Sequence, residues 1–125
     1  MDHPLTGKRI LIVEDEYFIA SELKHVLKKQ GAIVVGPVAD LSGGLALAAC
    51  EQLDGAVLDV NLEGAQTFPI ADQLAERMVP YVFMTGYDAW ALPEAYRGSP
   101  RLAKPVSMAS LISTIEQLIV EEESL

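Results

Sequence analysis

The sequence predicts an α/β fold in which a parallel sheet of five strands carries helices on both faces. Short apolar, β-branched runs alternate with longer segments whose apolar residues recur at helical spacing, and this alternation implies right-handed βαβ crossovers. The 125 residues match the usual size of one domain, and the 50% hydrophobic content suffices for a sizeable core. We therefore expect one domain spanning 1–125, with a core of about 8–120 and no output domain.

The elements follow from these two patterns. Predicted strands cover 8–13, 32–36, 55–59, 80–84 and 101–103, and predicted helices cover 16–30, 41–52, 67–78 and 107–120. The first helix ends at Gly31, a typical C′ residue. Because Pro37 follows the second strand directly, that strand belongs at the sheet edge. The second helix is weakened by two glycines at its start. Pro69 suits the first turn of the third helix, and Ser107 is a candidate N-cap for the last.

One connection fits the alternation poorly. Only 18 residues separate Thr85 from Lys104, and Pro93 and Pro100 interrupt them. A fourth helix must therefore be short or irregular, within 88–97.

Composition excludes several classes of protein. The net charge of −9 disfavours direct binding to nucleic acid, because the phosphate backbone repels an acidic domain. The N-terminus has no signal-peptide pattern, and no apolar run approaches the roughly 20 residues of a membrane span. We therefore expect a cytoplasmic protein without a membrane partner. The single cysteine, Cys50, excludes an intramolecular disulfide, and we expect it to be a small buried residue on a helix.

Four of the apolar runs end in residues that can handle a phosphoryl group. These residues are Glu14 and Asp15 after the first strand, Asp59 after the third, Thr85 after the fourth and Lys104 after the fifth. The carboxyl ends of parallel strands share one edge of the sheet, where open α/β sheets bind ligands. Three acids, a hydroxyl and an ammonium group are therefore expected to meet in one cleft.

Carboxylates crowded together at such an edge call for a compensating cation. Mg²⁺ prefers oxygen ligands and often shares one or two carboxylates with phosphate, so Glu14, Asp15 and Asp59 predict a Mg²⁺ site. The simpler alternative is that these acids cap helices or are merely solvated. That alternative does not account for Thr85 and Lys104.

A carboxylate beside Mg²⁺ can act as a nucleophile on phosphorus and form an acyl phosphate. Asp59 stands alone at a strand end, which suits this role. The charge on the transferred group must be neutralised, and we expect Mg²⁺, Lys104, the Thr85 hydroxyl and the Gly86 N–H to share that task. Taken singly, Lys104 could be a surface lysine and Thr85 a turn hydroxyl.

From about Arg9 to Val120, the chain resembles the CheY-like receiver domain of bacterial two-component response regulators. The segments that carry the resemblance are Val13-Glu14-Asp15, Leu58-Asp59-Val60-Asn61, Thr85-Gly86 and Lys104-Pro105. The resemblance implies a flavodoxin-like (βα)5 sandwich with strand order 2-1-3-4-5 and a cis Lys-Pro bond.

The resemblance also implies the roles of individual residues. Asp59 becomes the phosphoacceptor, and the main-chain carbonyl of Asn61 joins the acids around Mg²⁺. The phosphoryl donor is a sensor histidine kinase or a histidine phosphotransfer protein. Transfer and autodephosphorylation are catalysed by the domain itself, so the chain is a phosphoacceptor and not an enzyme in the usual sense. Output goes to an unknown downstream protein, or the domain acts as a phosphate sink.

Two features depart from the typical receiver pattern. Receivers usually carry an aromatic residue in strand five that turns inward on phosphorylation, and here Arg101 occupies that position. The segment Phe83-Met84-Thr85-Gly86-Tyr87 resembles the Phe-x-Thr-Gly-Tyr signature of a subgroup that lacks this aromatic residue, many of whose members stand alone. We therefore expect Thr85, Gly86 and Tyr87 to form the switch.

Two alternatives from other classes remain open at this point. A receiver-like binding module that is never phosphorylated would use a surface such as Trp90, Leu92 and Tyr96. A Mg²⁺-dependent aspartyl phosphatase of the haloacid-dehalogenase type would need a second acid two residues after the nucleophile, where this chain has Asn61.

Overall fold

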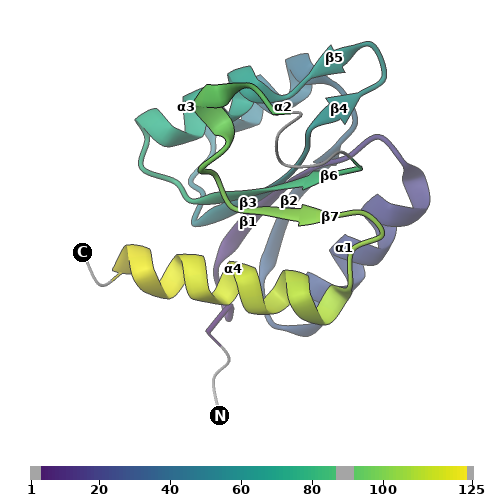
Figure 1. The fold of residues 1–125 in the computed structure, drawn as a ribbon. Helices are drawn as coiled ribbons and strands as arrows, with labels where there is room; N and C mark the ends of the chain where they lie inside the picture. Colours follow the sequence, from purple (N-terminus) through teal and green to yellow (C-terminus); the bar gives the residue numbers. More distant parts are fainter. Residues whose placement is uncertain (1–3, 87–91, 124–125) are drawn as a thin grey trace.

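The computed structural model describes residues 4–86 and 92–123 and centres on one parallel sheet (Figure 1). The sheet has the order β2-β1-β3-β6-β7. Its strands are β1 (Arg9–Val13), β2 (Ile33–Val38), β3 (Gly55–Asp59), β6 (Tyr81–Thr85) and β7 (Arg101–Ala103), and all neighbours pair in parallel. The predicted fold class and the strand order 2-1-3-4-5 are confirmed. β2 lies at an edge, as the proline indicated, although it runs to Val38 and so contains Pro37 instead of ending before it.

Helices cover both faces of the sheet. They are α1 (Tyr17–Lys29), α2 (Leu41–Cys50), α3 (Phe68–Glu76) and α4 (Met108–Glu123). The alternation of side chains along the strands divides the core in two. Leu11, Leu58 and Phe83 pack beneath α2 and α3, whereas Ile10, Val57 and Val82 pack beneath α1 and α4. Each central strand is therefore apolar on both faces, as a parallel sheet requires.

The glycines at the start of α2 serve close packing. A Cβ built on Gly44 would collide with the side chain of Ile70 on α3. The absence of a side chain at Gly44 therefore lets α2 approach α3, at the cost of the weak helix start seen in the sequence.

Some predicted positions are wrong in detail. Cys50 is exposed at the end of α2 rather than buried. The third helix was predicted to reach residue 78, but it ends at Glu76, and Met78 adopts a positive φ of 60° and is 70% exposed. The expected loop after β3 contains a short antiparallel ribbon of β4 (Asn61–Leu62) and β5 (Ala65–Gln66). Ser107 does act at the start of α4, where its hydroxyl accepts a hydrogen bond from Ser110 N at 3.3 Å.

The connection between β6 and β7 is irregular, as expected. Its described part contains one 3-10 turn, η2 (Glu94–Tyr96). Trp90 lies outside the described residues. Leu92 is 2% exposed and packs into the core with Tyr96 against it, so the predicted partner surface at Leu92 is wrong.

Among the described residues, no helix combines the length and apolar character needed to cross a bilayer.

Candidate functional site

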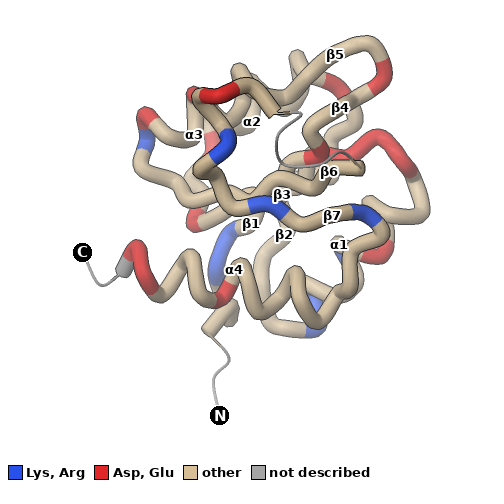
Figure 2. The backbone as a smooth tube through the Cα atoms, in the orientation of Figure 1, with Lys and Arg blue, Asp and Glu red and all other residues tan. Residues whose placement is uncertain are grey.

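The carboxyl ends of the central strands open into a cleft of about 550 Å³. Acidic residues gather at this end of the sheet, around the loop after β1 and the β4–β5 ribbon (Figure 2). The lining residues are Asp15, Glu16, Asp59, Val60, Asn61, Leu62, Glu63, Thr85, Gly86 and Lys104. With Glu14 buried behind them, the structure brings together all the described residues that the sequence assigned to metal and phosphoryl binding.

Three carboxylates meet at the floor of the cleft. Glu14 and Asp59 are 2% and 6% exposed, Asp15 is half-buried, and one oxygen of each lies within 4.8 Å of the others. Glu14 and Asp15 reach this point from the end of β1, and Asp59 from the end of β3, the neighbouring strand. An all-oxygen donor set of this kind fits a divalent cation such as Mg²⁺.

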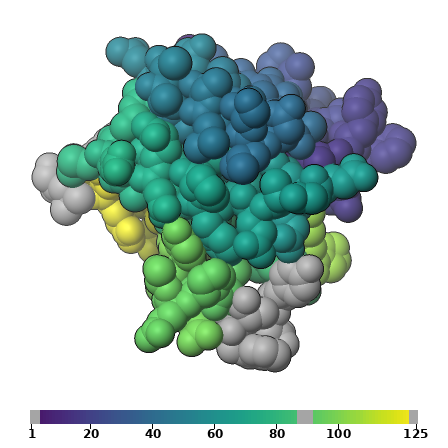
Figure 3. Space-filling model, turned by 90° about the horizontal axis from the view of Figure 1, so that it is seen from above, coloured from purple at the N-terminus to yellow at the C-terminus, as the bar shows by residue number. Residues whose placement is uncertain are grey.

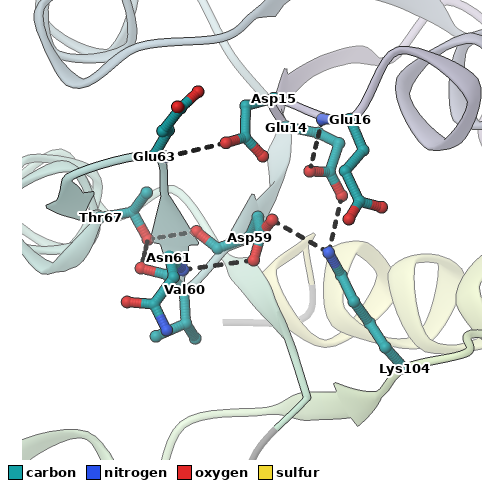
Figure 4. Close-up of polar contacts among 9 residues, drawn as sticks. All are labelled: Glu14, Asp15, Glu16, Asp59, Val60, Asn61, Glu63, Thr67 and Lys104. Atoms are coloured by element: carbon teal, nitrogen blue, oxygen red, sulfur yellow. Dashed lines mark hydrogen bonds and ion pairs between the residues drawn. The ribbon is translucent and has the colours of Figure 1, made fainter.

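Main-chain N–H groups orient each carboxylate (Figure 4). Glu63 N donates to Asp15 Oδ2 at 2.8 Å, and Asn61 N donates to Asp59 Oδ1 at 3.2 Å. Glu16 N donates to Glu14 Oε2 at 3.2 Å. Two of these donors belong to the β4–β5 ribbon or its turn, so the ribbon places the acids as well as closing the cleft.

Lys104 lies between two of the acids. Its Nζ is 3.0 Å from Asp59 Oδ2 and 3.1 Å from Glu14 Oε1, and its side chain is 22% exposed. The Lys104-Pro105 bond is cis, as expected, and Lys104 N donates to Thr85 O at 2.8 Å. Burial lowers the pKa of Lys104, but its hydrogen bonds and charge interactions with Asp59 and Glu14 outweigh this and raise the pKa above its usual value.

Glu14 is the acid most affected by its surroundings. Burial, followed by the interactions with Asp59, raises the pKa of Glu14 to about 7, although the hydrogen bonds from Glu16 N and Lys104 act in the opposite direction. Like charges in a water-poor site disfavour ionisation, so this cluster gains from a bound cation.

Of the remaining predicted site residues, some line the cleft and others do not. Thr85 is 2% exposed at the end of β6, and Gly86 is exposed beside it on the cleft wall. Tyr87 lies outside the described residues. Arg101 is exposed on β7, and its Nη1 donates to Arg97 O at 2.9 Å, so its side chain is not part of the cleft in this arrangement.

Sequence reasoning missed one residue at this site. Thr67 is fully buried, and its Oγ1 donates to Asp59 O at 2.6 Å, with Val60 O at 3.4 Å. It precedes α3 yet makes no side-chain capping bond to that helix. The available signal was Gly64 between Asp59 and Thr67, because a turn there folds the chain back toward the strand end.

The match to a family model identifies the class of the domain. The model for the response regulator receiver domain matches residues 10–116. This chain belongs to the receiver domain family. The acids at its cleft therefore cluster as they do in the Mg²⁺ sites of receivers.

Known receivers of similar sequence and structure extend this comparison. SdrG from Sphingomonas melonis Fr1 is 36% identical with a TM-score of 0.77, covering 94% of this chain and 98% of that one. A second SdrG structure, from Pseudomonas melonis Fr1, is of a BeF3-activated conformation. A CheY-like receiver from Methanospirillum hungatei JF-1 is 26% identical with a TM-score of 0.83, covering 95% of this chain and 98% of that one.

Among curated proteins, the receiver is similar to the transcriptional regulatory protein PdtaR of Mycobacterium tuberculosis. The identity is 31% over 113 residues, which is 87% of this chain and 55% of PdtaR. The chain spans about half the length of the curated relatives it matches.

Proposed function

We propose that this receiver accepts a phosphoryl group on Asp59 in the presence of Mg²⁺, and that this changes its contacts with a partner protein. The observation that carries the proposal is the convergence of Lys104 Nζ and the carboxylates of Glu14, Asp15 and Asp59 at one end of the sheet. Receiver domains receive phosphoryl groups from histidine kinases, so the donor class is a kinase or a histidine phosphotransfer protein.

Glu14, Asp15, Asp59 and the main-chain carbonyl of Asn61 are the proposed ligands of the cation. When bound, Mg²⁺ neutralises charge on the phosphoryl oxygens and on the crowded carboxylates. The Asn61 N–H orients the carboxylate of Asp59, and the Glu63 N–H orients that of Asp15, so both ligands are already in place.

The chemical step is displacement at phosphorus. A carboxylate oxygen of Asp59 forms the new P–O bond while the P–N bond of the donor phosphohistidine breaks, and the imidazole leaves with the bonding electron pair. Lys104 must exchange part of its ion pairing with Asp59 for a phosphoryl oxygen. The Thr85 hydroxyl and the Gly86 N–H are the proposed donors to another oxygen, since both groups line the same cleft.

The output is proposed to follow from the connection between β6 and β7. Phosphorylation biases this region between two arrangements and so alters which protein binds. Thr85, Gly86, Tyr87 and Arg101 remain the predicted switch residues. In this proposal the receiver is cytoplasmic and works as an adaptor or as a phosphate sink.

Intact-mass measurement tests the acceptor directly. The protein is incubated with Mg²⁺ and acetyl phosphate beside Asp59→Asn, and a phosphoryl adduct is expected on the wild type alone. The BeF3-activated SdrG structure motivates a second readout, which is binding of beryllofluoride with Mg²⁺. If neither adduct nor beryllofluoride binding occurs at any Mg²⁺ concentration, the chain is a binding module that is not phosphorylated.

A further inference from the structure

Thr67 fixes the main chain of the acceptor Asp59 by hydrogen bonds. The hydroxyl of this fully buried residue donates to the carbonyl oxygen of Asp59 at 2.6 Å, and Thr67 N donates to Val60 O at 3.0 Å. Both bonds attach the start of α3 to the residues that end β3. Any shift of the Asp59–Val60 main chain therefore moves the first turn of α3 or breaks a buried hydrogen bond.

The next residue of α3 contacts the connection between β6 and β7. The ring of Phe68 stacks on Tyr96 with centroids 4.4 Å apart and planes 16° from parallel. Tyr96 OH donates to Asp72 Oδ1, one turn further along α3, at 2.7 Å. This hydrogen bond, followed by burial, raises the pKa of Tyr96 to about 12. We call the contacts of Tyr96 with Phe68 and Asp72 the Tyr96 latch.

The latch lies in the described part of the connection between β6 and β7, and this connection starts at the phosphoryl site. Residues 92–100 lie against α3 in the space-filling view (Figure 3). The same connection begins at Thr85 and Gly86, which line the cleft. The latch is bonded by an exposed hydroxyl and carboxylate, whereas the Thr67 bond is fully buried. The latch is therefore the contact that opens at lower cost.

We infer that the first turns of α3 couple Asp59 to the 92–100 segment, with Thr67 as a positioning residue and the Tyr96 latch as the part that responds. This inference rests on the proposed function. A phosphoryl group at Asp59 draws Thr85 and Gly86 toward itself, and the latch opposes that movement by holding the far end of the connection on α3. The closed latch therefore stabilises the unphosphorylated arrangement, and opening it raises affinity for a phosphoryl group or its mimic.

The decisive measurement is the affinity of the full chain for beryllofluoride with saturating Mg²⁺, by isothermal titration calorimetry. Tyr96→Phe keeps the ring stack but removes the bond to Asp72, and we expect its affinity to rise roughly two- to tenfold. Tyr81→Phe is the matched control, because the Tyr81 hydroxyl lies 3.2 Å from Ser99 Oγ on the same connection but does not bond α3. Its affinity is expected to stay within about twofold of the wild type, since the contact it removes joins the connection to β6 and leaves both contacts of the latch in place.

A second pair of variants tests Thr67. Thr67→Val removes the hydroxyl at nearly constant volume and should lower the affinity for beryllofluoride. Thr67→Ser retains the hydroxyl, and its affinity should stay close to that of the wild type. In Thr67→Val the gain from Tyr96→Phe should shrink, because the two sites no longer share an intact connection. Hydrogen exchange of 92–100 should rise on adding beryllofluoride to the wild type, and rise less in Thr67→Val.

The outcomes separate the two proposals. If the wild type binds no beryllofluoride and gains no phosphoryl adduct, the proposed function fails. If the wild type binds but Tyr96→Phe leaves the affinity unchanged or lowers it, the latch inference is wrong while the proposed function stands. Equal affinities for Thr67→Val and Thr67→Ser would remove Thr67 from the positioning role.

Discussion

Two segments leave the same edge of the sheet, yet they are held in different ways. After β3, the chain is fixed by the main-chain bonds of the β4–β5 ribbon, by the Glu63 bond to Asp15 and by the buried Thr67 hydroxyl. After β6, the described part of the connection is held mostly by side chains, such as those of Leu92, Tyr96 and Arg97. The acceptor side is thus rigid by main-chain hydrogen bonding, and the other side can rearrange by exchanging side-chain contacts.

The largest expected effect comes from removing the ammonium group of Lys104, which pairs with the acceptor Asp59 and with Glu14. In Lys104→Met, the buried carboxylates of Glu14 and Asp59 lose their partner, and unfolding free energy without metal at pH 8 should fall by about 3–5 kcal/mol. Mg²⁺ should restore more stability in this variant than in the wild type, as measured by thermal unfolding with and without the ion. An equal Mg²⁺ effect in both proteins would mean that Lys104 does not compensate the acids.

Matched hydroxyl deletions compare the two segments directly. Thr67→Val leaves a buried carbonyl without its donor and should cost about 1–3 kcal/mol, whereas Tyr96→Phe loses an exposed hydrogen bond and should cost less than about 1 kcal/mol. Urea unfolding measures both. If Tyr96→Phe proved the more destabilising, the 92–100 segment would be the rigid side and the comparison would reverse.

The acidic cleft and the 92–100 segment should also titrate in different pH ranges. The folded pKa of Glu14, about 7, lies above its unfolded value of 4.5, so the folded state holds an extra proton between these values. Stability without metal should therefore fall as pH rises from about 4.5 through 7, with a slope of at most about 1.4 kcal/mol per pH unit. Glu14→Gln should flatten this slope in denaturant unfolding followed at several pH values.

In the 92–100 segment, the raised pKa of Tyr96 means that its effect on stability should change only in alkaline solution. The folded value of about 12 exceeds the unfolded 10, so its contribution is complete below pH 10 and is lost as pH rises through 12. Spectroscopic titration of tyrosinate, compared with Tyr96→Phe, checks this assignment. A tyrosine that ionises near pH 10 in the wild type and disappears in that variant would contradict the latch geometry.

The smallest effect is expected at the start of the β6–β7 connection. A Cβ built on Gly86 meets none of the described residues within 4 Å, so Gly86→Ala should change stability by less than about 0.5 kcal/mol. Gly44→Ala, where the new Cβ would meet Ile70, should cost about 1–3 kcal/mol and serves as the contrasting variant. Thermal unfolding of both variants would show whether the entrance to this connection is as loosely packed as the geometry indicates.

The sequence by itself determined the architecture and the composition of the cleft. Alternating buried strands and amphipathic helices specify a parallel sheet, because each pattern matches a single backbone period. The acids, Thr85 and Lys104 each follow directly on a strand, so their meeting at one edge follows from the topology alone. Pro37 marked the edge strand because proline lacks the N–H that a central strand would donate to its neighbour.

Only the tertiary structure decided which side chains are covered and which partners they find. Cys50 was predicted to be buried, but burial depends on how far a neighbouring element extends over each position, and none of the described elements covers this one. Leu92, which the alternative of a binding module would place on a partner surface, is buried. The bonds of Thr67 to Asp59 and of Tyr96 to Asp72 span 8 and 24 residues. Such pairs form only when chain reversals bring the partners together. Gly64 marks one of these reversals in the sequence, but local sequence does not specify which side chains then pair.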